Sequence, residues 1–161
     1  MEIRPLSSEA FSAYGDVIEV SSTSKHFSIN EGHTERYHDL AKVDVTKDHG
    51  KPLISIFRAS PLPIPHKITV MERHPLSSQA FIPMGQEPYL VVVAAKGEFT
   101  ANKIKVFMAQ ANQGVNYHAG TWHHYCFALQ QVSDFLVVDR GGEGHNCDFV
   151  ELDGSQVIQL P

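Results

Sequence analysis

The feature that most restricts the fold of this chain is a long succession of short runs of β-branched, aromatic and aliphatic residues. Proline, glycine, asparagine and aspartate separate the runs, a pattern typical of strands joined by turns. With almost no helix between them, such runs predict an all-β sandwich or barrel whose closure protects the sheet edges. No repeat or linker interrupts the series, so we expect a single domain over residues 1–161. The expected strands lie at residues 17–20, 53–58, 66–73, 80–82, 89–95, 103–109, 121–129, 133–139, 147–152 and 157–160.

One short helix is expected, over residues 7–15. Ser7 or Ser8 can cap its first turn, because a side-chain oxygen there can accept from a free backbone amide. Gly15 suits the position after the last turn, where glycine commonly ends a helix. The rest of the chain offers no other convincing helical pattern.

Two segments depart from ordinary strand alternation. Residues 21–38 are polar without a clear period, and we interpret them as a long loop that contains at most one strand. Residues 90–94 are apolar at every position, which favours a strand buried on both faces, either centrally or under a partner subunit.

Composition narrows the class of function. The formal net charge is −5 with no basic run, which argues against nucleic-acid binding because phosphate contacts need clustered lysine and arginine. No apolar run is long enough to span a membrane, and the first residues lack the apolar core of a signal peptide. Cys126 and Cys147 are too few for a disulfide scaffold. We therefore expect a cytoplasmic protein that acts on a small molecule without an organic cofactor.

Histidines gather in one stretch of the chain. Residues 114–125 hold three of the ten histidines, two glycines and the only tryptophan. Histidine is the commonest metal ligand and titrates most readily near neutral pH. A second group, Glu72 and His74 followed by Gln79, offers the same chemistry earlier in the chain. We expect these two stretches to face one pocket.

Strand alternation predicts which of these side chains point inward. In the earlier stretch, Ile68 and Val70 share a face with Glu72 and His74, so we expect that face to be inward. In the later stretch, the alternation groups one histidine with two apolar residues further on. His123 shares a face with Phe127 and Leu129, which selects it over His124 as the inward histidine.

Two spaced motifs resemble those of the cupin superfamily. The first is Glu72-x-His74 with Gln79, and the second is His118-x-Gly120-x-x-His123. The usual motifs carry histidine at the position of Glu72, glutamate at that of Gln79 and proline at that of His118. The resemblance implies a cupin-like jelly roll and a mixed metal site made by Glu72, His74, Gln79 and His123.

A closer resemblance, to the ureidoglycolate lyase family, covers nearly the whole chain. It implies cleavage of (S)-ureidoglycolate to glyoxylate and urea in allantoin degradation, a homodimer, and a divalent metal cofactor for which nickel is the candidate. It is carried by Pro5-Leu6-Ser7, Phe11-x-x-Tyr14-Gly15-Asp16-Val17-Ile18-Glu19, Arg36-Tyr37-His38-Asp39-Leu40, Glu72-Arg73-His74-Pro75-Leu76, Gln79-Ala80-Phe81-Ile82-Pro83-Met84, Gln113-Gly114-Val115-Asn116-Tyr117-His118, Trp122-His123-His124 and Asp139-Arg140-Gly141-Gly142.

The substrate implied by this resemblance is a hemiaminal, so its cleavage needs a base for the hydroxyl proton and an acid for the departing nitrogen. The candidate base or metal ligand is His74 or His123, and the candidate acid is His118 or His124. The substrate carboxylate needs a positively charged guanidinium group that can donate two hydrogen bonds to it. Another side chain within the histidine-rich stretch could also contact the substrate. The candidates for these binding roles are Arg73, Arg36, Arg140 and Tyr117.

Two other functions compete with the lyase interpretation. One is a different metal-dependent cupin enzyme that acts on a small molecule, such as an oxygenase or isomerase. The other is a barrel that binds glyoxylate without catalysis. A requirement for iron and oxygen would favour the first, and tight glyoxylate binding without turnover would favour the second.

Overall fold

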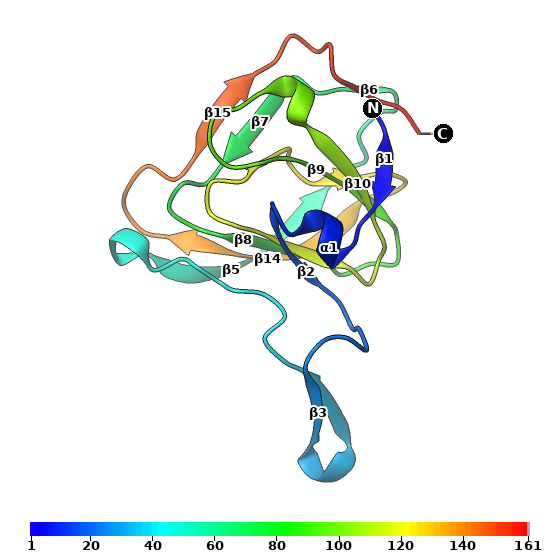
Figure 1. Cartoon of the computed structure of the whole chain (residues 1–161), viewed down its shortest axis with the longest axis vertical. Coiled ribbons are helices and arrows are strands. Elements are labelled where there is room, and N and C mark those ends of the chain that lie inside the picture. Colours follow the sequence, from blue (N-terminus) through cyan, green and yellow to red (C-terminus); the bar gives the residue numbers. More distant parts are fainter. Residues whose placement is uncertain (161) are drawn as a thin grey trace.

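The computed structural model describes residues 1–160 and consists mainly of two β-sheets that face each other (Figure 1). The first sheet has seven strands in the order β1-β10-β9-β12-β7-β15, with β13 also paired to β9. Its strands are β1 (Ile3–Pro5), β7 (Val70–Arg73), β9 (Tyr89–Ala94), β10 (Lys105–Ala109), β12 (Trp122–His123), β13 (Phe127–Ala128) and β15 (Asp148–Glu151). The prediction of an all-β sandwich is confirmed.

The second sheet has five strands in the order β2-β11-β8-β14-β5. Its strands are β2 (Gly15–Ile18), β5 (Lys51–Ala59), β8 (Gln79–Pro83), β11 (Gly114–Tyr117) and β14 (Ser133–Gly141). A pair made by β6 (His66–Lys67) and β16 (Val157–Ile158) lies beside the main sheets, and three single 3₁₀ turns occur at η1 (Asn30–Gly32), η2 (Lys47–His49) and η3 (Ala101–Lys103). The sequence pattern missed β1 and β11, which are short.

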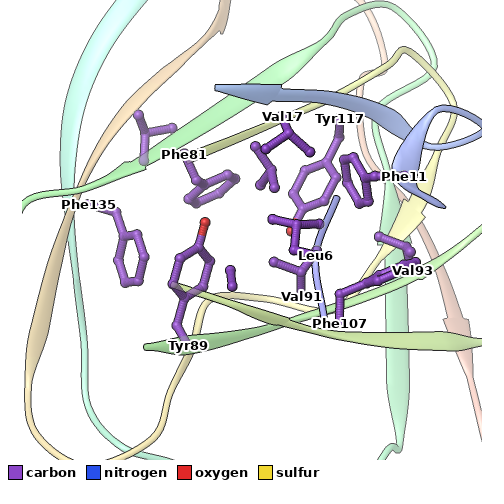
Figure 2. Close-up of a cluster of buried hydrophobic side chains, with 13 residues drawn as sticks. Leu6, Phe11, Val17, Phe81, Tyr89, Val91, Val93, Phe107, Tyr117 and Phe135 are labelled. Carbon is purple, nitrogen blue, oxygen red and sulfur yellow. The ribbon is translucent and has the colours of Figure 1, made fainter. Parts of the chain in front are cut away.

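The main core fills the space between the two sheets (Figure 2). Alternate side chains of the central strands point into it, and the four aromatic rings of Phe81, Tyr89, Tyr117 and Phe135 pack edge to face. Burial of this apolar surface is the principal stabilising contribution to such a fold. The core residues are Leu6, Phe11, Val17, Phe81, Tyr89, Val91, Val93, Phe107, Ala109, Val115, Tyr117, Phe135 and Val137.

A second apolar cluster covers the outer face of the first sheet. It contains Leu90 and Val92 from β9 together with Ile158 from the C-terminal segment. Strand β9 is therefore buried on both faces, as its sequence predicted, and residues of the same chain supply the cover. This strand is consequently not exposed to a partner subunit.

The N-terminal helix is shorter than predicted. Helix α1 (Ser8–Phe11) is a single turn, and the Ala10 amide donates to the Ser7 hydroxyl oxygen at 3.2 Å, which confirms Ser7 as the cap. Gly15 does not end the helix, because it is the first residue of β2. A Cβ there would lie 2.0 Å from the Asn116 carbonyl oxygen, so close strand approach is what requires glycine at this position.

Three predicted segments have a different structure. Residues 21–38 contain a hairpin of two strands, β3 (His26–Ile29) and β4 (Thr34–Tyr37), which stands away from the body in Figure 1. The predicted strand at 66–73 divides into β6 and β7, and that at 121–129 divides into β12 and β13. No helix within residues 1–160 is long and apolar enough to cross a membrane.

Candidate metal centre and cavity

Glu72, His74 and His123 meet where β7 and β12 lie side by side. His123 is directly opposite Glu72 in the antiparallel register, and His74 follows the last residue of β7. One ligand atom from each of the three residues lies within 4.8 Å of the others. The structure thus brings together three of the four predicted metal ligands.

The hydrogen bonds of the two histidines fix which nitrogens face each other. His74 donates from Nδ1 to the Asn146 carbonyl oxygen at 2.6 Å, and His123 donates from Nδ1 to the Thr121 carbonyl oxygen at 3.0 Å. Because a carbonyl can only accept, each ring carries a hydrogen on Nδ1, which leaves Nε2 as the atom through which it could bind a metal. Both Nε2 atoms are buried without a hydrogen-bond partner among residues 1–160.

Glu72 places a carboxylate beside these two imidazole nitrogens. Its Oε1 lies 3.5 Å from His123 Nε2, too long for a well-formed hydrogen bond. The neighbouring His123 holds the pKa of Glu72 below its usual value against the opposing effect of burial, whereas burial and the nearby His123 lower the pKa of His74. A carboxylate and two imidazole nitrogens that converge in this way are a donor set that suits a cation.

Gln79, the fourth predicted ligand, lies on the wall of the same cavity. Its Oε1 is buried without a hydrogen-bond partner among the described residues. Its amide nitrogen donates to Asp139 Oδ2 at 3.5 Å, and Asp139 Oδ1 is likewise buried and unpartnered. Two further oxygen acceptors are therefore available beside the cluster.

Of these three residues, His74 lines a cavity of about 350 Å³, within the range of small-molecule sites. Its walls come from the start of β8, the end of β14 and the glycine-containing loop between β14 and β15. The residues that line it are His74, Ser77, Gln79, Asp139, Arg140, Gly144, His145, Asn146 and Cys147.

Arg140 is the one predicted carboxylate-binding arginine that lines this cavity. Its Nε and Nη2 donate to the carbonyl oxygens of Lys47, Asp48 and Glu143 at distances between 2.8 and 3.2 Å. These bonds hold the guanidinium in place, and Nη1 makes no hydrogen bond to residues 1–160. The guanidinium of Arg140 is thus fixed in position, with Nη1 available to a ligand.

The other two arginines lie elsewhere. Arg73 donates to Asp148 at 2.7 Å and to the Gly97 carbonyl oxygen at 3.0 Å, and its guanidinium lies 4.5 Å from the centre of the Trp122 ring. Arg36 lies on the β3–β4 hairpin, over the Phe27 ring. Neither lines the cavity.

Two predicted catalytic histidines are also placed outside the cavity. His118 pairs with Asp16 at 3.1 Å in a separate surface depression. His124 is buried against His66, with 3.4 Å between the Nε2 atoms, and burial lowers the pKa of His124 to about 4. Their positions do not support the acid roles expected of them.

Tyr117, predicted to contact the substrate, also lies outside the set of residues that line the cavity. Its buried ring stacks on His123, with 4.4 Å between ring centres and 10° between planes. Burial raises the pKa of its hydroxyl, so the side chain is neutral. Tyr117 therefore packs against the ring of a candidate metal ligand.

Several cavity residues were not singled out from the sequence. Ser77, His145, Asn146 and Cys147 reach the site through loop connections, where strand alternation has no meaning. The Asp139-Arg140-Gly141-Gly142 stretch was the one signal that this part of the chain belongs to the site. Figure 1 shows the loop between β14 and β15 at the same end of the sandwich as the start of β5.

The fold and the site define a small all-β protein with a candidate metal-binding cluster beside a polar cavity. A family model described as ureidoglycolate lyase matches residues 1–159. The ureidoglycolate lyase of Burkholderia cepacia is 51% identical over 161 residues, which cover 99% of this chain and 90% of that protein. That of Burkholderia mallei (strain NCTC 10229) is 51% identical over 146 residues, with 91% and 85% coverage. That of Pseudomonas syringae pv. syringae (strain B728a) is 48% identical over 159 residues, with 98% and 93% coverage. This chain belongs to the ureidoglycolate lyase family.

Proposed function

We propose that the protein is an enzyme that cleaves (S)-ureidoglycolate to glyoxylate and urea in allantoin degradation. The observation that carries this function is the convergence of three acceptor atoms from Glu72, His74 and His123 at a cavity walled by Arg140. The substrate offers the matching groups, a carboxylate for the arginine and adjacent oxygens for a cation. Family membership supports the same reaction.

The donor set fits a divalent metal ion. Two imidazole nitrogens and one carboxylate oxygen suit zinc, nickel or iron, and the unpartnered Gln79 Oε1 supplies a fourth position. Glu72, His74, His123 and Gln79 would hold the ion. Bound there, it would supply Lewis-acid chemistry, which lowers the pKa of an alcohol oxygen.

Arg140 would bind and orient the substrate carboxylate. Its guanidinium is buried and tied to three backbone carbonyl oxygens, so little side-chain freedom remains to be lost when a ligand binds. Charge-assisted hydrogen bonds of this kind are roughly twice as strong as neutral ones. The arginine therefore fixes the end of the substrate that does not react.

Two cavity residues are placed to move the protons. Asp139 Oδ1 is an unpartnered acceptor, and we assign it the hydroxyl proton of the substrate. His145 donates from Nε2 to Asp148 at 2.8 Å, so in its doubly protonated form it would carry a second proton on Nδ1 that it can give to the departing nitrogen. As the carbonyl forms, the carbon–nitrogen bond breaks, its electron pair stays on the nitrogen, and a proton from His145 completes urea.

Product analysis tests this function. Metal-stripped and metal-restored protein is incubated with ureidoglycolate, and urea, ammonia and glyoxylate are assayed separately. We expect urea and glyoxylate without ammonia, and loss of activity in Glu72→Gln but not in the exposed control Glu9→Gln. Ammonia would indicate hydrolysis of the ureido group, and no turnover by the metal-restored protein would refute the proposal.

We also propose a single cupin-like domain that forms a homodimer in the cytoplasm. The two sheets share one core, which supports one domain with cupin-like architecture. Both cysteines are free, which suits a reducing compartment. The homodimer is what the resemblance to the ureidoglycolate lyase family implies.

A further inference from the structure

The outer face of the second sheet carries a row of aliphatic side chains, which we call the aliphatic face. Phe135 and Val137 of β14 point into the core, so Leu136 and Val138 between them point outward. The register places Leu136 between Ile56 and Ile82 and places Val138 beside Ile54. The aliphatic face comprises Ile18, Ile54, Ile56, Ile82, Leu136 and Val138.

This face is unusually exposed for its composition. Ile54 and Ile56 are 77% and 53% exposed, and they lie on β5, a nine-residue strand at the edge of its sheet. The first sheet has its own apolar cluster over its outer face, whereas no equivalent cluster covers this one among residues 1–160. Contiguous aliphatic surface of this kind marks an interface.

A second feature occurs on the same side of the molecule. The β3–β4 hairpin, which we call the arm, projects away from the body on the side where β5, β14 and β2 lie (Figure 1). Within residues 1–160 its strands pair only with each other. An isolated two-stranded hairpin is at best marginally stable in water. The arm therefore needs a surface to pack against.

We propose that the aliphatic face and the arm together form the interface with a second copy of this chain, with each arm lying against its partner. A two-fold axis would bring the same patch of both copies together, as in most homodimers. The register puts Phe27 and Arg36 side by side on one face of the arm, with Ile29 on the same face. This face offers apolar contact area and one charged hydrogen-bond donor.

The size of the surface explains why both parts are required. Five strands about 4.8 Å apart give a width of about 24 Å, and the aliphatic positions extend about 13 Å along the strands, roughly 300 Å² in projection. A stable interface needs about 800 Å² from each partner. The sheet face alone is too small, and the arms must supply most of the remaining area.

This assignment rests on the proposed homodimer, and one experiment separates the two. The mass of the wild-type protein and of Ile56→Glu is measured by light scattering over a range of concentrations. Phe149→Glu is the matched control, because Phe149 is 64% exposed on β15 at the opposite edge of the first sheet. We expect a wild-type dimer whose dissociation constant rises at least about 100-fold in Ile56→Glu, since two buried charges each cost on the order of tenfold or more, and remains unchanged in Phe149→Glu.

The outcomes distinguish the proposals. A monomeric wild type would refute the homodimer and this interface together. A wild-type dimer that persists in Ile56→Glu would refute this interface and leave the homodimer standing. Ile54→Glu serves the same purpose if Ile56→Glu loses its native circular dichroism.

Hydrogen exchange of the arm provides an independent measurement. In the dimer we expect the amides of β3 and β4 to be protected, and in Ile56→Glu we expect them to exchange at least about 100-fold faster because the arm loses its packing surface. Phe27→Ser should weaken dimerisation without changing the folded state of the barrel. Equal exchange of the arm in dimeric wild type and monomeric variant would show that the arm lies outside the interface.

Discussion

His74 donates to the backbone carbonyl of Asn146 across 2.6 Å, although the two residues are 72 positions apart in the sequence. The Asn146 side chain also makes hydrogen bonds to two residues that follow His74 in the chain. Its Oδ1 accepts from the Leu76 amide at 2.8 Å, and its Nδ2 donates to the Ser77 hydroxyl oxygen at 2.9 Å. Asn146 thus locks the loop between β14 and β15 to the chain that carries His74.

Loss of the Asn146 side-chain hydrogen bonds should weaken metal binding even though all the candidate ligands remain. Asn146→Ala deletes both side-chain bonds, so the carbonyl that orients His74 becomes mobile. We expect metal affinity to fall 10- to 100-fold, the usual cost of losing outer hydrogen bonds to a ligand. Competition with a chelating dye measures the affinity, and the exposed Asn112→Ala is the control. An unchanged affinity would show that the loop holds His74 without this side chain.

Tyr117 should support His123 through its ring and not through its hydroxyl. The rings stack at 4.4 Å, and no hydrogen bond from the Tyr117 hydroxyl occurs among residues 1–160. Tyr117→Phe should therefore keep metal affinity within about twofold. Tyr117→Leu should lower both metal affinity and stability, since aromatic pairs contribute about 0.5–1.5 kcal/mol beyond their buried area. Equal effects of the two substitutions on metal affinity would argue for a role of the hydroxyl.

The two cysteines should differ in reactivity. Burial raises the pKa of Cys126 to about 12, which leaves almost no thiolate at neutral pH. Cys147 lines the cavity, with Sγ 3.9 Å from Glu72 Oε2, although burial and the nearby Glu72 also raise its pKa. We expect iodoacetamide to modify Cys147 first and to block the cavity. Mass spectrometry locates the adduct, and faster labelling in Cys147→Ser than in wild type would contradict the prediction.

The core should tolerate truncation far less than the surface. Phe135 is 1% exposed and packs against Phe81 and Tyr89 in the main core (Figure 2). Phe135→Ala should cost about 3–5 kcal/mol in the free energy of unfolding, because a cavity replaces the ring. The exposed Phe149→Ala should change it by less than about 0.5 kcal/mol. Urea unfolding measures both, and similar losses would mean that Phe149 is buried in the native assembly.

Strand alternation correctly predicted that His123 points inward, although one of the residues used for that prediction was assigned to the wrong face. Phe127, expected on the same face, belongs to the outer cluster. The reason is a change in register along β9, where Val93 pairs with His123 and Leu90 pairs with Phe127. Phe127 is four residues after His123, whereas Leu90 is only three residues before Val93, so the segment from His123 to Phe127 contains one extra residue. An extra residue of this kind reverses the alternation. Ile68 fails similarly, since it packs in the outer cluster with Met71 and not on the face of Glu72.

Other parts of the structure could not be predicted from local pattern. Alternation reports which face of a strand is buried, and the arm has no buried face, so β3 and β4 gave no periodic signal. Asn146 and His145 reach the cavity only because β15 pairs with β7, a contact between distant segments. The sequence therefore revealed three candidate metal-binding side chains on or beside strands and missed the loop that lines the adjoining cavity.

Asp16 should make stability depend on acidity below pH 4. Burial alone would raise its pKa, but hydrogen bonds from Asn116, His118 and the Lys42 amide outweigh that effect and lower it. A carboxyl whose pKa is lower in the folded state stabilises the fold above its unfolded pKa of about 3.9, and the contribution disappears as pH falls through the folded value. Asp16→Asn should thus be less stable than wild type at pH 7, and the difference should shrink towards pH 3. Urea unfolding at both values measures this, with Glu9→Gln as an exposed control. A difference that grows in acid would mean that Asp16 is destabilising when ionised, and that its hydrogen bonds do not compensate for burial.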